Sequence, residues 1–118
     1  MTDDRFDVQD RPDESRYVLI DTEADDAVIG EEVYTDLDGA RPVRILVHTG
    51  VSEAYGSQGL ASLLVRHVID DVIGGGRDIV PVCPYVVGWL SRHPEYDGHV
   101  VEATGEHRDA ATSRRRSS

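Results

Sequence analysis

The segment 43–73 constrains the fold more than any other, because a strand, a turn of small residues and a helix follow one another within it. Val43, Ile45 and Val47 alternate with the residues between them, which is typical of a strand. Apolar residues then recur at spacings of three and four, as on the buried face of a helix; they are Ala61, Leu64, Val65, Val68 and Val72. The pattern predicts a strand that leads through a short turn into an amphipathic helix.

The turn Gly56-Ser57-Gln58-Gly59 lies where this helix must begin. The first amides of a helix have no partner inside it, and the helix dipole places partial positive charge there. Glycines remove the side chains that would keep a phosphate away from those amides, so the turn predicts an anion site. A Walker loop is excluded because the chain contains no Lys, and the dinucleotide pattern fails because Gly56 and Gly59 are the turn's only glycines.

The first half of the chain is expected to be an antiparallel meander. Strands are predicted at 16–21, at 27–37 and from Val43 onward, with turns at Asp25-Asp26 and Asp38-Gly39. Thr49-Gly50 is expected to form a bulge at the end of the third strand.

The second half is expected to add one long helix and short elements. The helix should run from Ser57 or Gln58 to Ile73 and stop at the three glycines that follow. A strand at 78–83 is predicted to lie parallel to the third strand, since the helix crosses between them. A short helix at 85–91 and a last helical turn or strand at 95–101 complete an α+β fold with a mixed, mostly antiparallel sheet.

The two ends of the chain have little to bury. Residues 1–15 are charged and are expected to form a disordered acidic leader. Residues 103–118 lack apolar periodicity and are expected to form a disordered Arg/Ser tail, whose arginines at 114–116 are interpreted as a solvated basic end. One domain at 16–102 remains, in agreement with a length of 118 residues.

Charge and composition narrow the partners and the location. The net charge is −11, which opposes nonspecific binding to nucleic acid or to an anionic membrane. A single Cys fits a reducing compartment, and no apolar run approaches the roughly 20 residues of a membrane span. The acidic N-terminus lacks the apolar core of a signal peptide, so a cytoplasmic protein is expected, as a monomer or dimer and without a metal site.

Three ordered motifs resemble one enzyme superfamily. The run Gly56-Ser57-Gln58-Gly59-Leu60-Ala61 resembles the pyrophosphate loop Arg/Gln-x-x-Gly-x-Gly/Ala of the GNAT N-acetyltransferases, with Gly56 in place of the usual Arg or Gln. The motif His48-Thr49-Gly50-Val51 precedes the loop, and the segments 81–86 and 92–96 follow it. Their order is similar to that of the short YjdJ-like branch of the superfamily, and the resemblance covers roughly residues 17–100.

The resemblance implies a small GNAT-like fold that binds acetyl-CoA. It implies that the strand end at His48, Thr49, Gly50 and Val51 splays from its neighbour, so that free amides hold the pantetheine arm. It further implies that the loop residues Gly56, Ser57, Gln58, Gly59, Leu60 and Ala61 hold the diphosphate, and that Arg92 reaches a CoA phosphate. The alternative for Arg92 is a solvated helix end.

Four side chains are candidates for the chemistry of acetyl transfer. His48 is a candidate base, and the alternative is a His whose ring bonds the backbone and shapes the bulge. Cys83 precedes a short helix, whose N-terminus would favour the thiolate, but a lone Cys is often a small buried hydrophobe. Tyr85 and Tyr96 are candidate acids for the departing thiolate, or they pack against the core or the cofactor.

The sequence thus predicts an N-acetyltransferase that moves acetyl directly from acetyl-CoA to an amine of an unknown acceptor. The acidic surface favours a cationic acceptor such as a polyamine or a basic peptide. One alternative is an acyl-CoA-binding module without catalysis, which Gly56 and the short chain favour. Another is a structural partner protein that has lost CoA binding.

Overall fold

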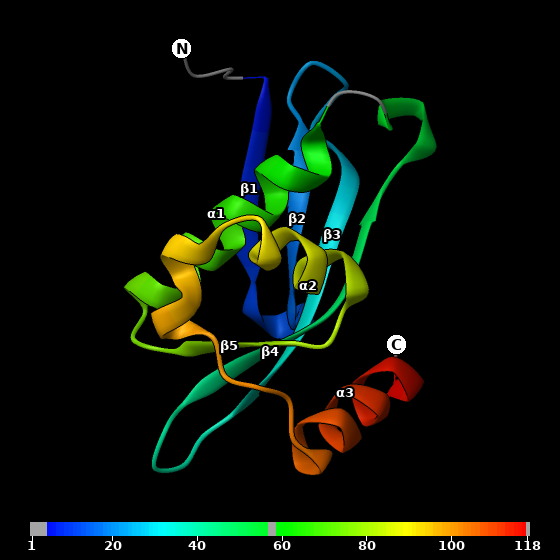
Figure 1. The fold of residues 1–118 in the computed structure, drawn as a ribbon. Helices are drawn as coiled ribbons and strands as arrows, with labels where there is room; N and C mark the ends of the chain where they lie inside the picture. Colours follow the sequence, from blue (N-terminus) through cyan, green and yellow to red (C-terminus); the bar gives the residue numbers. More distant parts are fainter. Residues whose placement is uncertain (1–4, 57–58, 118) are drawn as a thin grey trace.

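A five-stranded sheet forms the centre of the computed structural model, which describes residues 5–56 and 59–117 (Figure 1). The strands lie side by side in chain order from β1 to β5. The first four are antiparallel, and β5 is parallel to β4. The strands are β1 (Phe6–Arg11), β2 (Arg16–Asp21), β3 (Ala27–Leu37), β4 (Val43–Val51) and β5 (Asp78–Pro81).

Within residues 5–56 and 59–117, three α-helices and three short 3₁₀ turns connect or flank the sheet. The helices are α1 (Leu60–Gly74), α2 (Pro84–Ser91) and α3 (Gly105–Ser117). The 3₁₀ turns are η1 (Pro12–Glu14), η2 (Glu53–Tyr55) and η3 (Pro94–His99). The predicted strands, the long helix and the short helix are all confirmed, and so is the parallel pairing of β4 and β5. The segment predicted as a helical turn or a strand is η3, after which Val100 bridges to Ile79 beside β5.

The turns of the meander have the residues that their geometry needs. Asp25 and Asp26, between β2 and β3, both have φ of 57°, and aspartate tolerates this left-handed conformation better than most residues. Pro42 directly precedes β4, where a missing amide is tolerated. The short connections therefore bring β2, β3 and β4 together before α1 crosses to β5.

The sheet separates two apolar clusters. The larger lies between the sheet and the helices α1 and α2, and Trp89 and Leu64 are fully buried in it. The smaller lies on the other face, where α3 contacts β3 and β4. It contains Val33, Val43, Ile45, Val47, Val80 and Ala111. The domain is thus a sheet covered by helices on both faces, as Figure 1 shows with α1 and α2 on one side and α3 apart from them.

The expected disorder of the leader is wrong for residues 6–14. Residues 6–11 form β1, which pairs along its length with β2. Phe6 and Val8 pack against the larger apolar cluster, and Arg5 pairs with Asp21. Two apolar residues at a spacing of two thus bury one face of a strand that is otherwise charged.

The expected disorder of the tail is wrong as well. Residues 105–117 form α3, and Ala111 on this helix is 2% exposed against the smaller cluster. Arg114 donates a hydrogen bond of 2.8 Å to the carbonyl of Glu14, so it joins the tail to η1 rather than lying in solvent. The helix covers a sheet face that would otherwise expose valines and isoleucine, and tertiary burial outweighs its weak intrinsic pattern.

Candidate functional site

The strand that leads to the predicted anion-site loop, β4, parts from its parallel neighbour β5. The two strands pair only from Val43 to Leu46 on β4, opposite Asp78 to Pro81. The amides of Val82 and Cys83 both donate to the Leu46 carbonyl, at 3.1 and 3.0 Å. Beyond this point β4 continues to Val51 in register with β3 alone, among the strands of the described chain. The splay that the resemblance implied is therefore present in the strand geometry.

The predicted bulge lies two residues earlier than expected. The register of β3 and β4 shifts between the pairs Tyr34–Leu46 and Val33–His48, so the extra residue is Val47 and not Thr49-Gly50. Val47 is buried with Ile45 in the cluster under α3, and this apolar contact fixes the bulge there.

The position of the bulge decides which side chains of β4 face α1 and α2 and which face α3. Directly opposed residues of an antiparallel pair share one face of the sheet. His48 pairs with Val33, which packs under α3, so the exposed His48 lies on the α3 face. Thr49 pairs with Glu32 and lies on the opposite face, with Cys83. The structure thus brings Thr49 and Cys83 together and places His48 on the other side.

The start of α1 has the conformation that an anion site needs. Gly59 is its N-cap with φ of 70°, and the amide of Leu63 donates to the Gly59 carbonyl at 3.3 Å. The amides of Leu60 and Ala61, in the first turn, therefore have no partner within the helix. The predicted loop residues Ser57 and Gln58 lie outside the described residues.

The connection before the loop uses its own amides internally. The amide of Ser52 donates to the Ile29 carbonyl at 2.7 Å, and the amide of Gly56 donates to the Glu53 carbonyl at 3.1 Å. Gly56 is exposed, but its amide is engaged within the turn that closes η2. The amides that remain for a ligand in the described part of the loop are those at the N-terminus of α1.

A hydrogen-bonded chain of three side chains lies on the face of the sheet that α1 and α2 cover, near the point where β4 and β5 separate. The Thr49 hydroxyl donates to Oε1 of Glu32, and Oγ1 of Thr49 lies 3.3 Å from Sγ of Cys83. Glu32 is 0% exposed and Cys83 is 5% exposed. The other carboxyl oxygen of Glu32, Oε2, has no hydrogen-bond partner among the described residues. A buried carboxyl thus adjoins the candidate thiol.

Burial raises the pKa of Glu32 well above its ordinary value, because the ionised form loses its hydration. Hydrogen bonds from Thr49 and from the His48 amide lower that pKa, but they do not outweigh burial. Glu32 is not among the site residues predicted from the sequence. The sequence pattern that could have pointed to Glu32 is the alternation along β3, which places position 32 on the same inward face as Tyr34.

The remaining candidate side chains are spread around α2. Tyr85 is 37% exposed in the first turn of this helix, and Arg92 is its exposed C-terminal cap. The Tyr96 hydroxyl donates to Asp70 at 2.8 Å, which raises the pKa of Tyr96. The Tyr96 ring also packs against Trp89, with 5.7 Å between ring centroids. Tyr96 is thus tied to the outer side of α1, whereas the Tyr85 ring is open to solvent.

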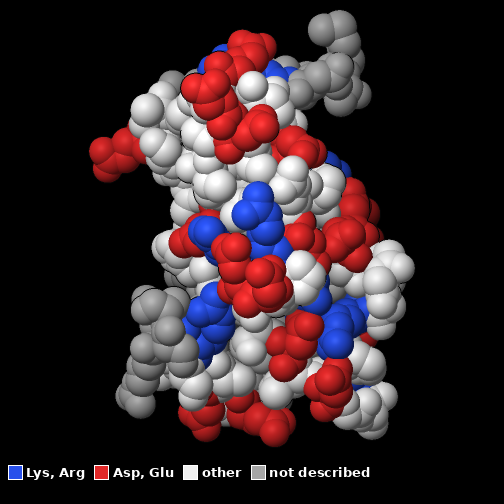
Figure 2. All heavy atoms as spheres, turned by 180° about the vertical axis from the view of Figure 1, so that it is seen from behind, with Lys and Arg blue, Asp and Glu red and all other residues white. Residues whose placement is uncertain are grey.

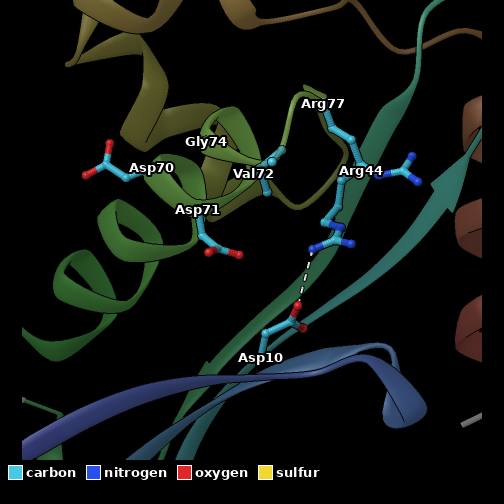
Figure 3. Close-up of a pocket in the computed structure, with 8 residues that line it drawn as sticks. Asp10, Arg44, Asp70, Asp71, Val72, Gly74 and Arg77 are labelled. Carbon is cyan, nitrogen blue, oxygen red and sulfur yellow. Dashed lines mark ion pairs between the residues drawn. The ribbon is translucent and has the colours of Figure 1, made fainter.

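A separate pocket of about 510 Å³ lies at the other end of α1 (Figure 3). Arg44 and Arg77 enter it from one side and Asp70 and Asp71 line it from the helix. These groups bond within the protein: Arg44 binds Asp36, Arg77 binds Asp38, and Tyr17 donates to Asp71. Its charges thus have partners within the protein itself, and the pocket is remote from Gly59.

Acidic residues outnumber basic ones in the chain, 23 to 12. Figure 2 shows them spread over the face seen from behind, with arginines lying among them rather than gathered into a patch. Of the helices in the described part of the chain, none is long and apolar enough to cross a bilayer.

The fold and the site define a class: a small α+β domain in which two parallel strands part, and the longer of them leads to a helix whose N-cap is a left-handed glycine. Residues 16–99 match the model of the GCN5-related N-acetyl-transferase family, and the chain belongs to that family. It is therefore an acyltransferase of the GNAT type, as the sequence motifs predicted. The sequence has no significant match among curated proteins.

Two solved structures are similar to the chain to different degrees. A GCN5-like protein of Staphylococcus aureus, solved by NMR, superposes with a TM-score of 0.60 at 20% identity, over 89% of this chain and 97% of that one. A ribosomal-protein-alanine N-acetyltransferase of Brucella melitensis gives 0.49 at 19% identity, over 81% of this chain and 66% of the other. At such identity the similarity to the Staphylococcus protein shows the fold alone.

Proposed function

We propose that this domain binds acetyl-CoA and transfers the acetyl group directly to an amine of an acceptor. The observation that carries the proposal is the parting of β4 from β5 after Leu46, on the strand that leads through η2 to the N-terminus of α1. The diphosphate would bind the amides of Gly59, Leu60 and Ala61, and the loop residues Gly56, Ser57 and Gln58 would flank it. The pantetheine arm would follow Thr49, Gly50 and Val51 along β4.

The chemistry needs a neutral amine, donors for the oxyanion and a proton for the leaving thiolate. A lysine-like amine has a pKa of about 10.4, so a base must take its proton near neutral pH. His48 is the candidate base for an amine that arrives on the α3 face, and Tyr85 is the better placed acid because its ring is exposed. Main-chain amides of the splayed strand would bind the oxyanion.

The charge and composition of the chain lead to proposals for the acceptor and for the cellular location. The net charge of −11 favours a cationic acceptor, either a polyamine or a basic peptide. We assign the chain to the YjdJ-like branch because its motifs flank the loop in the same order. We also place it in the cytoplasm, as a monomer or dimer, since a lone Cys suits a reducing compartment.

Arg92, exposed at the end of α2, would bind a CoA phosphate.

The alternative is an acyl-CoA-binding module without turnover. Gly56 favours it, because the family usually has Arg or Gln there and a side-chain contact to the phosphate would be missing. The short chain favours it too, since few residues remain to enclose an acceptor.

Isothermal titration with acetyl-CoA, followed by release of free CoA thiol over a panel of amines, tests these functions. Saturable binding with thiol release that depends on the amine supports the transferase. Binding without release for any amine supports the module, and absence of binding rejects both. The panel should contain spermidine and a lysine-rich peptide beside a neutral-peptide amine, because a cationic acceptor predicts faster release with the first two.

A further inference from the structure

Glu32 on β3 places a carboxyl group inside the core, on the face of the sheet that α1 and α2 cover. It is 0% exposed, and its Oε2 has no hydrogen-bond partner among the described residues. An ionised carboxylate with an empty oxygen is costly to bury, whereas the neutral acid leaves only a carbonyl oxygen without a partner. The geometry therefore favours a glutamic acid that keeps its proton in the folded chain.

Among the described residues, the side chains packed around this carboxyl carry no positive charge. On β2 the directly opposed residue is Tyr17, whose hydroxyl donates to Asp71. The buried residues of α1 are all aliphatic, and those of α2 are two aliphatic residues and a tryptophan. Burial raises the pKa of Glu32 well above its ordinary value, and the nearby Cys83 and Glu31 raise it further. The surroundings thus agree with a neutral Glu32.

The Thr49 hydroxyl connects this carboxyl to a sulfur atom. Its Oγ1 is hydrogen-bonded to Oε1 of Glu32 and lies 3.3 Å from Sγ of Cys83, where either atom can be the donor. An ionised Glu32 accepts the single proton of Thr49, but a neutral Glu32 donates its own proton to Oγ1. The proton of Thr49 is then free to turn toward sulfur. Thr49 can therefore take a proton from the buried acid and donate one to a sulfur atom.

Thr49 also lies where a thioester is expected. It is on β4 beyond Leu46, where β5 no longer pairs with this strand. The pantetheine arm is proposed to follow this part of β4, and the sulfur of acetyl-CoA is at the end of that arm. Thr49 is half-buried and Glu32 is fully buried, so a ligand would reach the hydroxyl and not the carboxyl behind it.

We propose that Glu32 is the proton source for the CoA thiolate that departs during acetyl transfer, and that the Thr49 hydroxyl delivers the proton. This inference rests on the proposed function, and it adds a second acid to Tyr85 at the start of α2. Thr49 touches the departing sulfur and is the catalytic residue of the pair. Glu32 acts through Thr49 and is a positioning residue.

The step balances without a further reagent. The amine nitrogen forms a bond to the acetyl carbon, and the bond from that carbon to the CoA sulfur breaks. The sulfur takes the hydroxyl proton of Thr49, while Oγ1 takes the proton from Oε1 of Glu32. The amine passes its own proton to His48, which releases it to solvent. Glu32 regains a proton from solvent through Thr49 once CoA has left.

Infrared spectroscopy of the free protein tests whether Glu32 is neutral. A carboxylic-acid carbonyl band is expected for the wild type near pH 7, where exposed carboxyls are ionised, and it should be missing from Glu32→Gln. Glu31→Gln changes the neighbouring half-buried residue and is the control, which should keep the band. A wild type without the band would overturn the proposal, because an ionised Glu32 has no proton to give.

Single-turnover release of CoA thiol to an amine tests the delivery of the proton. Transfer from acetyl-CoA should slow about a hundredfold in Glu32→Gln and in Thr49→Val, and Thr49→Ser should restore it because the hydroxyl returns. Transfer from acetyl-seleno-CoA, in which selenium replaces the thioester sulfur, should change little in the same variants, because a selenolate leaves without a proton. The loss of rate that the wild type shows as rising pH ionises Glu32 should be missing from Glu32→Gln.

Each result supports or overturns the proton source. Equal slowing with acetyl-CoA and acetyl-seleno-CoA, or equal rates for Thr49→Val and Thr49→Ser, would reduce the two residues to structural supports. Sensitivity to the leaving group in Tyr85→Phe alone would make Tyr85 the acid and overturn the inference, with the transferase intact. A wild type without binding or without transfer to any amine would reject the proposed function and this inference with it. If Glu32→Gln does not fold, the two threonine variants with the two acyl donors are sufficient.

Discussion

The guanidinium of Arg5 donates two hydrogen bonds to the carboxylate of Asp21, each 3.0 Å long, where the start of β1 meets the end of β2. The Tyr55 hydroxyl donates to the same carboxylate at 2.6 Å, and so does the amide of Glu23 at 2.9 Å. A single buried side chain thus joins the N-terminal strand to η2, the turn that precedes the anion-site loop.

Replacing Asp21 with Asn should destabilise the protein in a pH-dependent way. Pairing with Arg5, and then with Tyr55, lowers the pKa of Asp21 far below its ordinary value. A lowered pKa stabilises the fold above the ordinary pKa of about 3.9, and this contribution is lost as the pH falls through the folded-state pKa. Asp21→Asn should therefore lower the urea midpoint at pH 7, and the gap should narrow below about pH 4. Asp13→Asn, an exposed change in η1, is the control and should leave the midpoint unchanged.

Helix α3 should be needed for stability although it is distant from the site. Ala111→Asp would bury a charge without a partner against Val33 and Val47, which should cost about 2 kcal/mol or more. Thr112→Asp, on the exposed side of the same helix, should change stability by less than about 0.5 kcal/mol. Thermal unfolding of both variants measures the difference. Equal melting temperatures would mean that α3 does not cover this cluster in solution.

The sequence was sufficient for the elements whose pattern is strong. The meander, the long helix and the parallel last strand were predicted because alternation, helical spacing and glycine stops all agree within 16–91. The terminal elements were missed because each relies on very few apolar residues: Phe6 and Val8 in β1, and Ala111 in α3. Such elements are stable only against a partner surface, and that surface is not visible in their own sequence.

The site was predictable in its backbone and not in its side chains. Gly59 could be located because a helix start with glycine has a recognisable pattern. The extra residue at Val47 could not, and this one-residue shift exchanges the faces of His48 and Thr49. The candidate base from the sequence therefore lies on the α3 face, while Glu32, from another strand, adjoins Cys83.

Replacing Gly59 with Val should abolish binding of acetyl-CoA. Its φ of 70° strains any β-branched residue, and the new side chain would occupy the space where the diphosphate meets the amides. Gly76→Val is the matched control, because Gly76 has φ of 84° beyond the opposite end of α1. Both variants should lose about 1–2 kcal/mol of stability from strain. Only Gly59→Val should lose the calorimetric binding signal, and equal affinities would place the diphosphate elsewhere.

Cys83→Ala should keep acetyl transfer to an amine, because the proposed route is direct. We expect kcat/KM within about threefold of the wild type when an amine is present, with the pH profile unchanged. Steady-state release of CoA thiol over a range of amine concentrations provides the measurement. A hundredfold loss of kcat with unchanged affinity for acetyl-CoA would instead make an acetyl-Cys intermediate obligatory, and ping-pong kinetics in the wild type would agree with it.

Glu32→Gln should make the protein more stable than the wild type at alkaline pH. The raised pKa of Glu32 means that the folded state holds this proton more tightly than the unfolded state. The contribution is fully present below the unfolded-state pKa of about 4.3 and is lost as the pH rises through the folded-state value, at about 1.4 kcal/mol for each unit between them. Glutamine places an uncharged group at the same position, so the variant loses no stability as the pH rises between the unfolded-state and folded-state pKa values of Glu32. Urea midpoints of the two proteins should be similar near pH 4 and diverge toward pH 9 in favour of the variant. Glu31→Gln, a half-buried change on the other face of β3, serves as the control and should show no such divergence.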